Sequence, residues 1–462
     1  MHKIFFAVNT DQDFYLPSQL RNHLNKNNIN HVLFLQEFQS RGRNDSDRHK
    51  KYHERYETWY DFNLIDYVNV LRVIRNYNQN LGLLTDLEIT TGKHNDLLYL
   101  INHFKNLEQC DLYCFSIYQQ YFLDYIISAL TIFRKNPKSR ILFGGPEMKL
   151  MPPIRELCNR IGISTSIGDL EPSVQRALTE PFQLDYTSYL KLNTLTEQDV
   201  PLPYSKETLE YANYRITINS SRGCPNNCYY CSGPQLSNYR SVKRDIFIDW
   251  IKQLQNTGIK NIFINDNNFG ANRLEYVVDQ LAKFNKIPIG FELELRHLTP
   301  TLVEKMKEAK MRSQSYGLEC IHPEMSKMMN KKMPDIDKTI EILSTIKSGK
   351  WMNFFYIYGL PGQNKRIFKE EIDYIKKIQE KIPYMKVEPI PFYLSPKSYI
   401  EQNRDKFKIK IVSTLEEDAN KILPEHSDLF KRIYNRYDYP ERKNINDYYN
   451  LLKKEGFKGK DP

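Results

Sequence analysis

The chain has 462 residues, enough for two or three domains. Hydrophobic residues make up 40% and charged residues 26%, which excludes wholesale disorder, and no apolar run approaches the ~18 residues of a membrane span. The formal net charge is +10, but lysine and arginine are spread along the chain, which favours a solvated basic surface over a nucleic-acid partner.

The first 180 residues alternate between patterns typical of strands and of helices. The short N-terminal apolar run is stopped by polar residues, so it predicts a buried first strand and not a signal sequence. A polar insertion follows at 39–57. Strands are predicted at 3–8, 31–35, 111–117, 140–143 and 163–166, and helices at 16–26, 62–77, 96–104, 120–134, 153–161 and 171–178. This order predicts a doubly wound parallel sheet, which binds ligands at the carboxyl ends of its strands.

The second half of the chain repeats the alternation after a proline-containing linker at 181–213. Six strands are predicted there, at 215–220, 260–264, 289–295, 313–318, 353–357 and 386–390, with helices between them. Six such repeats predict a complete or partial barrel whose chemistry sits at the carboxyl ends of the strands. The tail from 396 is rich in Lys, Asn and Tyr and is predicted to be mostly helical.

Three of the seven cysteines gather in one loop directly after a predicted strand. Cys224, Cys228 and Cys231 have the spacing CxxxCxxC, and three thiolates in one loop can hold three irons of a [4Fe–4S] cube. The fourth iron is then open to the amino and carboxylate groups of a small molecule. The alternative is a zinc site, but a structural zinc site needs four ligands, and His297 lies far downstream.

These cysteines, with Tyr230 just before the last of them, resemble the signature of the radical S-adenosylmethionine (SAM) enzymes. The resemblance implies a (β/α)6 partial TIM barrel that binds a [4Fe–4S] cluster and SAM. It also implies reductive cleavage of SAM to methionine and a 5′-deoxyadenosyl radical, which abstracts a hydrogen atom from the substrate.

Further segments resemble the same family in the same order. The strand end at 263–269 resembles the segment that contacts the amino group of the methionine part of SAM. The third strand carries polar residues at the positions that contact the ribose or the carboxylate of SAM in this family. The segments at 315–320 and 329–331 resemble the fourth strand and the motif after it. The segment at 356–363 resembles the fifth-strand turn near the adenine, with Gln363 in place of the commoner glutamate. The cofactor-binding residues implied are Tyr230, Asp266, Asn267, Asn268, Glu292, Glu294, Glu319, Ile357 and Gly359.

The N-terminal half resembles the Rossmann-like cobalamin-binding domain that precedes the barrel in one large radical SAM subclass. Ser116 in the segment 114–118, and Gly144 and Gly145 at a strand end, carry this resemblance and are the implied cobalamin contacts. Two features depart from the pattern, since Leu170 replaces a glycine and no Asp-x-His-x-x-Gly occurs. The alternative is a domain that has lost the cofactor and only shapes the substrate pocket.

The remaining cysteines have simpler interpretations. Cys110, Cys114 and Cys158 are expected to be small buried hydrophobes. Cys320 ends the fourth predicted barrel strand, so it is either a packing residue or a catalytic hydrogen-atom donor to a substrate radical, as an epimerase requires. The odd cysteine count excludes a disulfide scaffold and favours the reducing cytoplasm.

Together these observations predict four segments: a cobalamin-binding-like Rossmann domain at 1–180, a linker at 181–213, a radical SAM partial barrel at 214–395 and a helical extension at 396–462. The leading expectation is cobalamin-dependent C-methylation of a small molecule or peptide, with an external electron donor such as flavodoxin or ferredoxin. The alternatives are a cobalamin-independent epimerase, mutase or other tailoring enzyme, and an RNA-modifying radical enzyme.

Overall fold

The computed structural model describes residues 1–8, 15–37, 61–87, 93–117, 122–195, 214–269, 273–345 and 352–457. The predicted polar insertion at 39–57 and Tyr118 lie outside these ranges. The chain divides into unit 1, which is Met1–Leu190 with Ile411–Asp438, and unit 2, which is Lys191–Lys410 with Tyr439–Pro462. None of the helices in the described ranges has the length and hydrophobicity needed to cross a bilayer.

Unit 1 is built on a six-stranded sheet in which all neighbouring strands are parallel. The strand order is β2 (His31–Glu37), β1 (His2–Val8), β3 (Leu112–Ser116), β4 (Ile141–Gly144), β5 (Ser164–Gly168) and β6 (Asp185–Ser188). The strand β6 lies in the segment expected to be a linker. Its four residues include one fully buried side chain, Tyr186, so the sequence pattern there is too short to stand out.

Helices cover both faces of this sheet because its strands are apolar on both faces. In β1, Ile4 and Phe6 pack toward α1 (Tyr15–Lys26) and α8 (Leu170–Thr179), whereas Phe5 and Ala7 belong to the cluster on the other face. The helices of that second face are α3 (Asp61–Asn78), α4 (Lys93–Asn106), α5 (Phe122–Lys135), α6 (Pro146–Leu150) and α7 (Pro152–Arg160).

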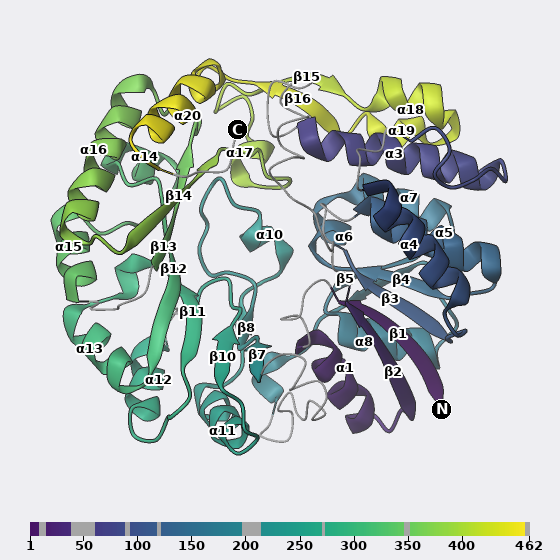
Figure 1. The fold of residues 1–462 in the computed structure, drawn as a ribbon, viewed down its shortest axis with the longest axis horizontal. Helices are drawn as coiled ribbons and strands as arrows, with labels where there is room; N and C mark the ends of the chain where they lie inside the picture. Colours follow the sequence, from purple (N-terminus) through teal and green to yellow (C-terminus); the bar gives the residue numbers. More distant parts are fainter. Residues whose placement is uncertain are drawn as a thin grey trace. The chain divides into compact units, whose positions relative to one another are not determined.

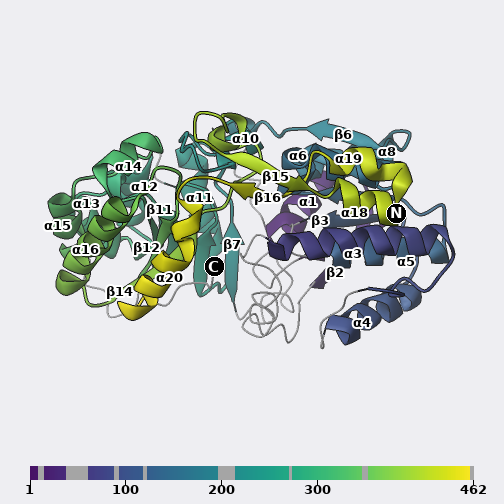
Figure 2. The same cartoon turned by 90° about the horizontal axis from the view of Figure 1, so that it is seen from above.

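Part of the C-terminal tail belongs to unit 1. The strands β15 (Lys410–Thr414) and β16 (Tyr434–Asp438) pair with each other, and α18 (Glu416–Ile422) and α19 (Ser427–Phe430) lie between them in sequence. Leu415 and Leu429 join the same hydrophobic cluster as α3, and α18 lies beside α3 (Figure 2).

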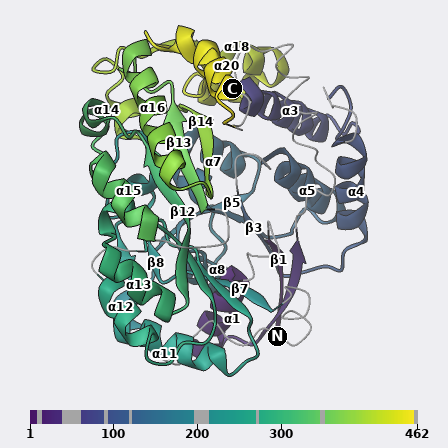
Figure 3. The same cartoon turned by 60° about the vertical axis from the view of Figure 1, so that its left-hand side comes forward.

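Unit 2 contains a second six-stranded parallel sheet, which curves inside a layer of helices (Figures 1 and 3). Its strands, in spatial order, are β14 (Met385–Pro391), β13 (Met352–Tyr358), β12 (Met311–Glu319), β11 (Ile289–Leu293), β10 (Asn261–Ile264) and β7 (Arg215–Ile218). The α/β fold with two parallel sheets is therefore confirmed, as is the six-repeat pattern of the second half.

The helices of unit 2 connect these strands and bury one apolar face each. The outer layer comprises α11 (Arg244–Gln255), α12 (Leu274–Leu281), α13 (Pro300–Glu308), α14 (Pro323–Met328), α15 (Ile336–Thr345) and α16 (Lys365–Lys381). The cysteine loop lies between β8 (Ser221–Arg222) and the short helix α10 (Gly233–Leu236), and β8 pairs antiparallel with β9 (Arg240–Ser241). Unit 2 also contains α17 (Tyr399–Gln402) and α20 (Ile445–Lys454).

Candidate active site

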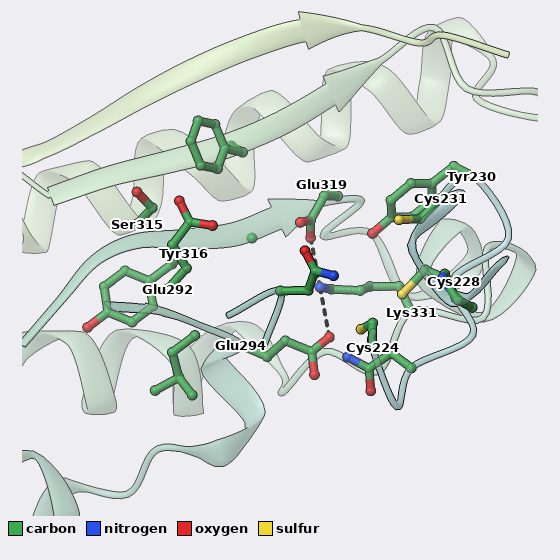
Figure 4. A pocket seen from close by; sticks show the side chains of 16 residues that line it. Cys224, Cys228, Tyr230, Cys231, Glu292, Glu294, Ser315, Tyr316, Glu319 and Lys331 are labelled. Atoms are coloured by element: carbon green, nitrogen blue, oxygen red, sulfur yellow. Dashed lines mark hydrogen bonds and ion pairs between the residues drawn. The ribbon is translucent and has the colours of Figure 1, made fainter. Parts of the chain in front are cut away.

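A cavity of about 150 Å³ lies in unit 2 at the carboxyl ends of β10, β11 and β12, beside the cysteine loop (Figure 4). Cysteines from the loop line one side, and glutamates from the strands line the other. The lining residues are Cys224, Asn226, Cys228, Tyr230, Cys231, Pro234, Asn267, Glu292, Leu293, Glu294, Ser315, Tyr316, Gly317, Glu319, Lys331 and Phe355.

All three loop cysteines line this cavity. Burial raises the pKa of each thiol, that of Cys228 to about 12. The Gly233 N–H donates to Cys231 Sγ at 3.2 Å, which stabilises the thiolate form of that residue. In the described ranges, no group of three or more His, Cys, Asp or Glu side chains lies close enough together to hold a single metal ion. A cubane cluster takes one thiolate on each iron, so three separate thiols beside a cavity fit three of its irons.

Asp266 holds the start of the cysteine loop. Its fully buried carboxylate accepts hydrogen bonds from the backbone N–H groups of Ser220 and Ser221 at 2.7 and 2.9 Å. The buried Arg273 lies 2.8 Å from the same carboxylate and also contacts Ser220. Asp266 therefore contacts the loop that carries the cysteines and is not among the residues that line the cavity, whereas its neighbour Asn267 is.

Arg296 connects the cysteine loop to the end of β11. Its guanidinium donates to Asn226 Oδ1 at 2.6 Å and to Glu294 Oε2 at 2.7 Å. Asn268 Nδ2 donates to the same Glu294 oxygen at 3.3 Å. Asn268 thus contacts a lining residue without lining the cavity itself.

The segment after α14 holds the other end of the loop. The Tyr229 N–H donates to the Met329 carbonyl at 2.9 Å, and Asn330 Nδ2 donates to the Asn227 carbonyl at 2.8 Å. The segment at 329–331, singled out by resemblance, therefore lies directly on the cysteine loop.

Residues from the start of the tail also contact the loop. The Ile400 N–H donates to the Tyr229 carbonyl at 3.0 Å, and the Ser232 hydroxyl donates to the Pro396 carbonyl. The Tyr229 and Tyr399 rings stack with centroids 3.9 Å apart. No role at the site was expected for the tail, since nothing local in its pattern indicates a contact with a loop so far away along the chain.

Lys331 bridges two of the cavity's carboxylates. Its buried Nζ lies 2.9 Å from Glu319 Oε2 and 3.1 Å from Glu294 Oε1 (Figure 4). Burial alone would lower the pKa of the Lys331 ammonium, but the two glutamates raise it above its ordinary value. Burial opposes ionisation of Glu294 too, but His297, Lys331 and Arg296 together hold its pKa well below the usual range.

Glu319 reaches the cavity because the end of β12 is irregular. The register with β13 shifts between Gly317 and Glu319, and Glu319 has a left-handed φ of 31°. Its carboxylate folds back over Gly317, where a Cβ atom would lie 2.0 Å from Glu319 Oε1. Glycine at 317 is therefore required for Glu319 to face the cavity.

Two further lining residues are less readily ionised than usual. Burial raises the pKa of Glu292, the nearby Glu319 adds to this effect, and a hydrogen bond with Ser315 opposes it. Burial also raises the pKa of Tyr230 well above its ordinary value, and its hydroxyl is hydrogen-bonded to Cys228.

Ile357 and Gly359, implied to contact SAM, do not line the cavity. Phe355, two residues before Ile357 on β13, does line the cavity. Side chains two apart on a strand point to the same face, so Ile357 lies on the same face as Phe355. Gly359 is held by other parts of unit 2: its N–H donates to Gln363 Oε1 at 2.5 Å and its carbonyl accepts from Tyr439 at 2.6 Å.

Cys320, the candidate hydrogen donor, is fully buried and is not among the residues that line the cavity. Burial raises the pKa of its thiol well above the ordinary value, and the Glu371 and Glu319 carboxylates add to this. The buried Glu371 accepts from the His322 N–H and from Tyr356, both at 3.0 Å. Cys320 therefore lies among buried side chains outside the cavity lining.

The implied cobalamin contacts meet at the carboxyl edge of the unit 1 sheet, where Ser116 and Gly144 are register partners in β3 and β4. The neighbouring Gly145 has a φ of +102°, and a Cβ there would lie 2.6 Å from the Ile117 carbonyl oxygen. Close approach of the chain to itself thus requires this glycine. A Cβ at Gly144 would meet the terminal methyl of Leu170 at 3.0 Å.

Several residues that shape the site were missed from sequence: Arg273, Arg296, Ser315, Gly317 and Tyr399. Arg273, Arg296, Ser315 and Tyr399 act through partners distant along the chain, so no local spacing indicates them. Gly317 acts through Glu319, whose turn toward the cavity depends on the register between β12 and β13. Lys331 had a signal, since it ends the segment at 329–331, but its two carboxylate partners could not be assigned.

Comparison with known proteins gives matches to a protein family, to curated relatives and to solved structures. Residues 218–375 match the radical SAM superfamily. A stretch of 227 residues is 22% identical to bacteriochlorophyllide d C-12(1)-methyltransferase of Chlorobaculum tepidum and covers 47% of this chain and 49% of that protein. A stretch of 191 residues is 24% identical to an uncharacterised protein of Methanocaldococcus jannaschii and covers 38% of this chain and 44% of that protein. The chain thus matches about half the length of these curated relatives.

The fold as a whole is similar to that of a solved enzyme. TsrM from Kitasatospora setae, a radical SAM methyltransferase, superposes with a TM-score of 0.60 and 11% identity over 88% of this chain and 76% of that chain, in a structure with tryptophan and a SAM analogue. A second TsrM structure, with cobalamin and a [4Fe–4S] cluster bound, gives a TM-score of 0.58 and 12% identity. At this identity the likeness shows the fold.

Proposed function

Residues 218–375 form a radical SAM domain, and from this premise we propose that the chain is a radical SAM methyltransferase acting on an unactivated C–H bond of a small molecule or peptide. The single observation that carries the proposal is one cavity lined by three cysteine thiols on one side and three glutamates on the other.

Cys224, Cys228 and Cys231 would hold the [4Fe–4S] cluster. When bound, the cluster supplies one electron for the reductive cleavage of SAM to methionine and a 5′-deoxyadenosyl radical. The protein's own contribution is to fix the loop: Asp266 and Arg273 hold its start, and Met329 and Ile400 hold Tyr229 near its end.

The charges of the cavity suit SAM, which carries a sulfonium, an ammonium and a carboxylate. Glu319 offers negative charge and Glu292 offers carboxyl oxygens to the two cationic groups, and Lys331 offers a cation to the carboxylate. Asn267 adds an amide donor and acceptor at the end of β10. We assign SAM binding to these four side chains.

Methyl transfer is favoured over other radical outcomes by two findings. One relative of the chain is a methyltransferase, and the fold likeness to TsrM extends over the N-terminal sheet as well as the barrel. Cobalamin, the methyl carrier in this proposal, would lie at the carboxyl edge of the unit 1 sheet near Ser116, Gly144 and Gly145. The residues fit provided that the flexible end of Leu170 turns away from Gly144.

The test is anaerobic reconstitution with iron and sulfide, followed by reaction with SAM and dithionite. We expect 5′-deoxyadenosine from the wild type and none from the Cys224→Ala, Cys228→Ala or Cys231→Ala variants. Cys158→Ala, which removes a buried thiol from unit 1, is the matched control and should retain both iron and cleavage. Cleavage of SAM by a variant that lacks all three loop cysteines would overturn the proposal.

A further inference from the structure

An aromatic cluster covers the side of the cysteine loop that does not face the cavity. Tyr230 lines the cavity, whereas its neighbour Tyr229 does not and instead stacks on Tyr399. Phe407 meets the Tyr229 and Tyr399 rings edge-on, with centroids 6.4 and 6.2 Å away. We call Tyr229, Tyr399 and Phe407 the aromatic cluster.

An exposed cation lies over this cluster. Lys406 Nζ is 5.6, 5.2 and 5.7 Å from the ring centroids of Tyr229, Tyr399 and Phe407. It also donates to the Tyr399 hydroxyl at 3.4 Å. A lysine in this position exposes its ammonium group to solvent, and its aliphatic chain covers the rings.

The surroundings of Lys406 are basic. The two segments that hold the loop, 327–332 and 397–410, carry seven lysines and arginines besides the buried Lys331, and only Glu401 and Asp405 oppose them. One of the seven, Lys410, begins β15 and is left out of the set named next. We call the following residues the basic face: Lys327, Lys332, Lys397, Arg404, Lys406 and Lys408.

We propose that the basic face, with the aromatic cluster beneath it, docks a small acidic electron-transfer protein of the flavodoxin or ferredoxin class. The inference rests on the proposed function, because only a cluster in the loop gives such a partner something to reduce. In the step, the docked donor is oxidised by one electron and the cluster held by the loop is reduced by one electron; no atom is transferred.

The position of the face favours a reductant over a substrate. Tyr229 directly follows Cys228, so a donor seated on its ring stands one residue from a cluster ligand, and electron transfer slows steeply with distance. A substrate must instead reach the cavity on the other side of the loop. Opposite net charges also speed the encounter of two proteins and make it sensitive to salt.

Binding of a purified flavodoxin to the reconstituted protein, measured by surface plasmon resonance at low and high salt, tests this directly. We expect Lys406→Glu and the double variant Lys327→Glu with Lys332→Glu each to weaken binding by about tenfold or more at low salt. Lys286→Glu is the matched control: Lys286 is equally exposed but lies before β11, at the opposite end of the strands. Unchanged flavodoxin affinity in the face variants would overturn the proposal.

Three further measurements separate the possible failures. Carbodiimide cross-linking should join flavodoxin carboxylates to lysines of the basic face, and cross-links confined to other lysines would contradict it. An equal loss of affinity for flavodoxin and for a single-stranded RNA oligomer would reveal a general polyanion surface and also contradict it. Dithionite needs no docking, so the double variant should cleave SAM normally with dithionite but slowly with reduced flavodoxin. If dithionite also fails with the wild type, the proposed function fails instead.

Discussion

Lys331 forms ion pairs with two carboxylates inside one cavity, and its removal should lower the stability of the fold. Lys331→Met leaves Glu294 with Arg296, His297 and Asn268 and leaves Glu319 without its ammonium partner, and both carboxylates are largely buried. We expect a loss of about 3–5 kcal/mol in the free energy of unfolding, because an uncompensated buried charge is costly.

A double-mutant cycle with Glu319→Gln isolates this effect. Removing both charges should cost less than the sum of the single variants, with a coupling of about 1 kcal/mol or more in urea unfolding. Additive losses would mean that the 2.9 Å pair contributes nothing to stability.

Cys320 provides a second test at the residue scale. Since its thiol is buried and does not line the cavity, Cys320→Ala should keep SAM cleavage and product formation and lose about 1 kcal/mol of stability from poorer packing. Product analysis in deuterated water distinguishes the alternative. A thiol donor would place one deuterium in the wild-type product and none in the variant's, a result that would favour an epimerase over a methyltransferase.

Among elements, α16 carries a buried acid that should make stability depend on pH. Burial raises the pKa of Glu371 to about 7, although His322, Gln363 and Tyr356 all donate hydrogen bonds to it. The folded state therefore keeps a proton that the unfolded chain releases near 4.5. Protonated Glu371 contributes its whole stabilisation below the pKa that it has in the unfolded chain. As the pH rises toward about 7, this contribution is lost and the free energy of unfolding falls by up to about 3 kcal/mol.

Thermal unfolding of the wild type and Glu371→Gln at about pH 5 and pH 7.5 checks this expectation. The wild type should lose stability over this range, and the variant, which has no proton to release at this position, should show a smaller change. Glu380→Gln, an exposed substitution on the same helix, should behave as the wild type. Identical pH dependence in all three proteins would show that Glu371 does not titrate as expected.

At the scale of elements, the sequence predicted the structure wherever the pattern that indicates it is local. The alternation of strand and helix patterns and the spacing of Cys224, Cys228 and Cys231 were enough to predict a parallel sheet and a cluster loop. The side chain of Asp266 was expected on SAM but bonds the cysteine loop, since a strand-end carboxylate looks the same from sequence in either role. The bulge that turns Glu319 into the cavity was likewise invisible, because it depends on the register between β12 and β13.

For the whole molecule, Leu170 offers the means to test whether unit 1 binds cobalamin. Its methyl group lies against Gly144, so Leu170→Ala should clear the strand end and raise the cobalamin content of the purified protein. Leu170→Phe should fill the space and lower it. Leu178→Ala, about two turns further along α8, is the control. A wild type without cobalamin despite ample supply, and unaltered by Leu170→Ala, would favour a domain that has lost the cofactor.

The two backbone contacts of Tyr229 also set an order of events during synthesis. The partners of this residue are Met329 and Ile400, both far downstream. At about 5–20 residues per second, Ile400 is made on the order of ten seconds after Tyr229. Until Ile400 has been made, the three thiols are outside the ribosome without the full set of contacts that hold their loop. The complete set of contacts that holds the loop therefore forms only after Ile400 has been made, and before that the growing chain passes through an interval in which its thiols are open to oxidation or to the wrong metal.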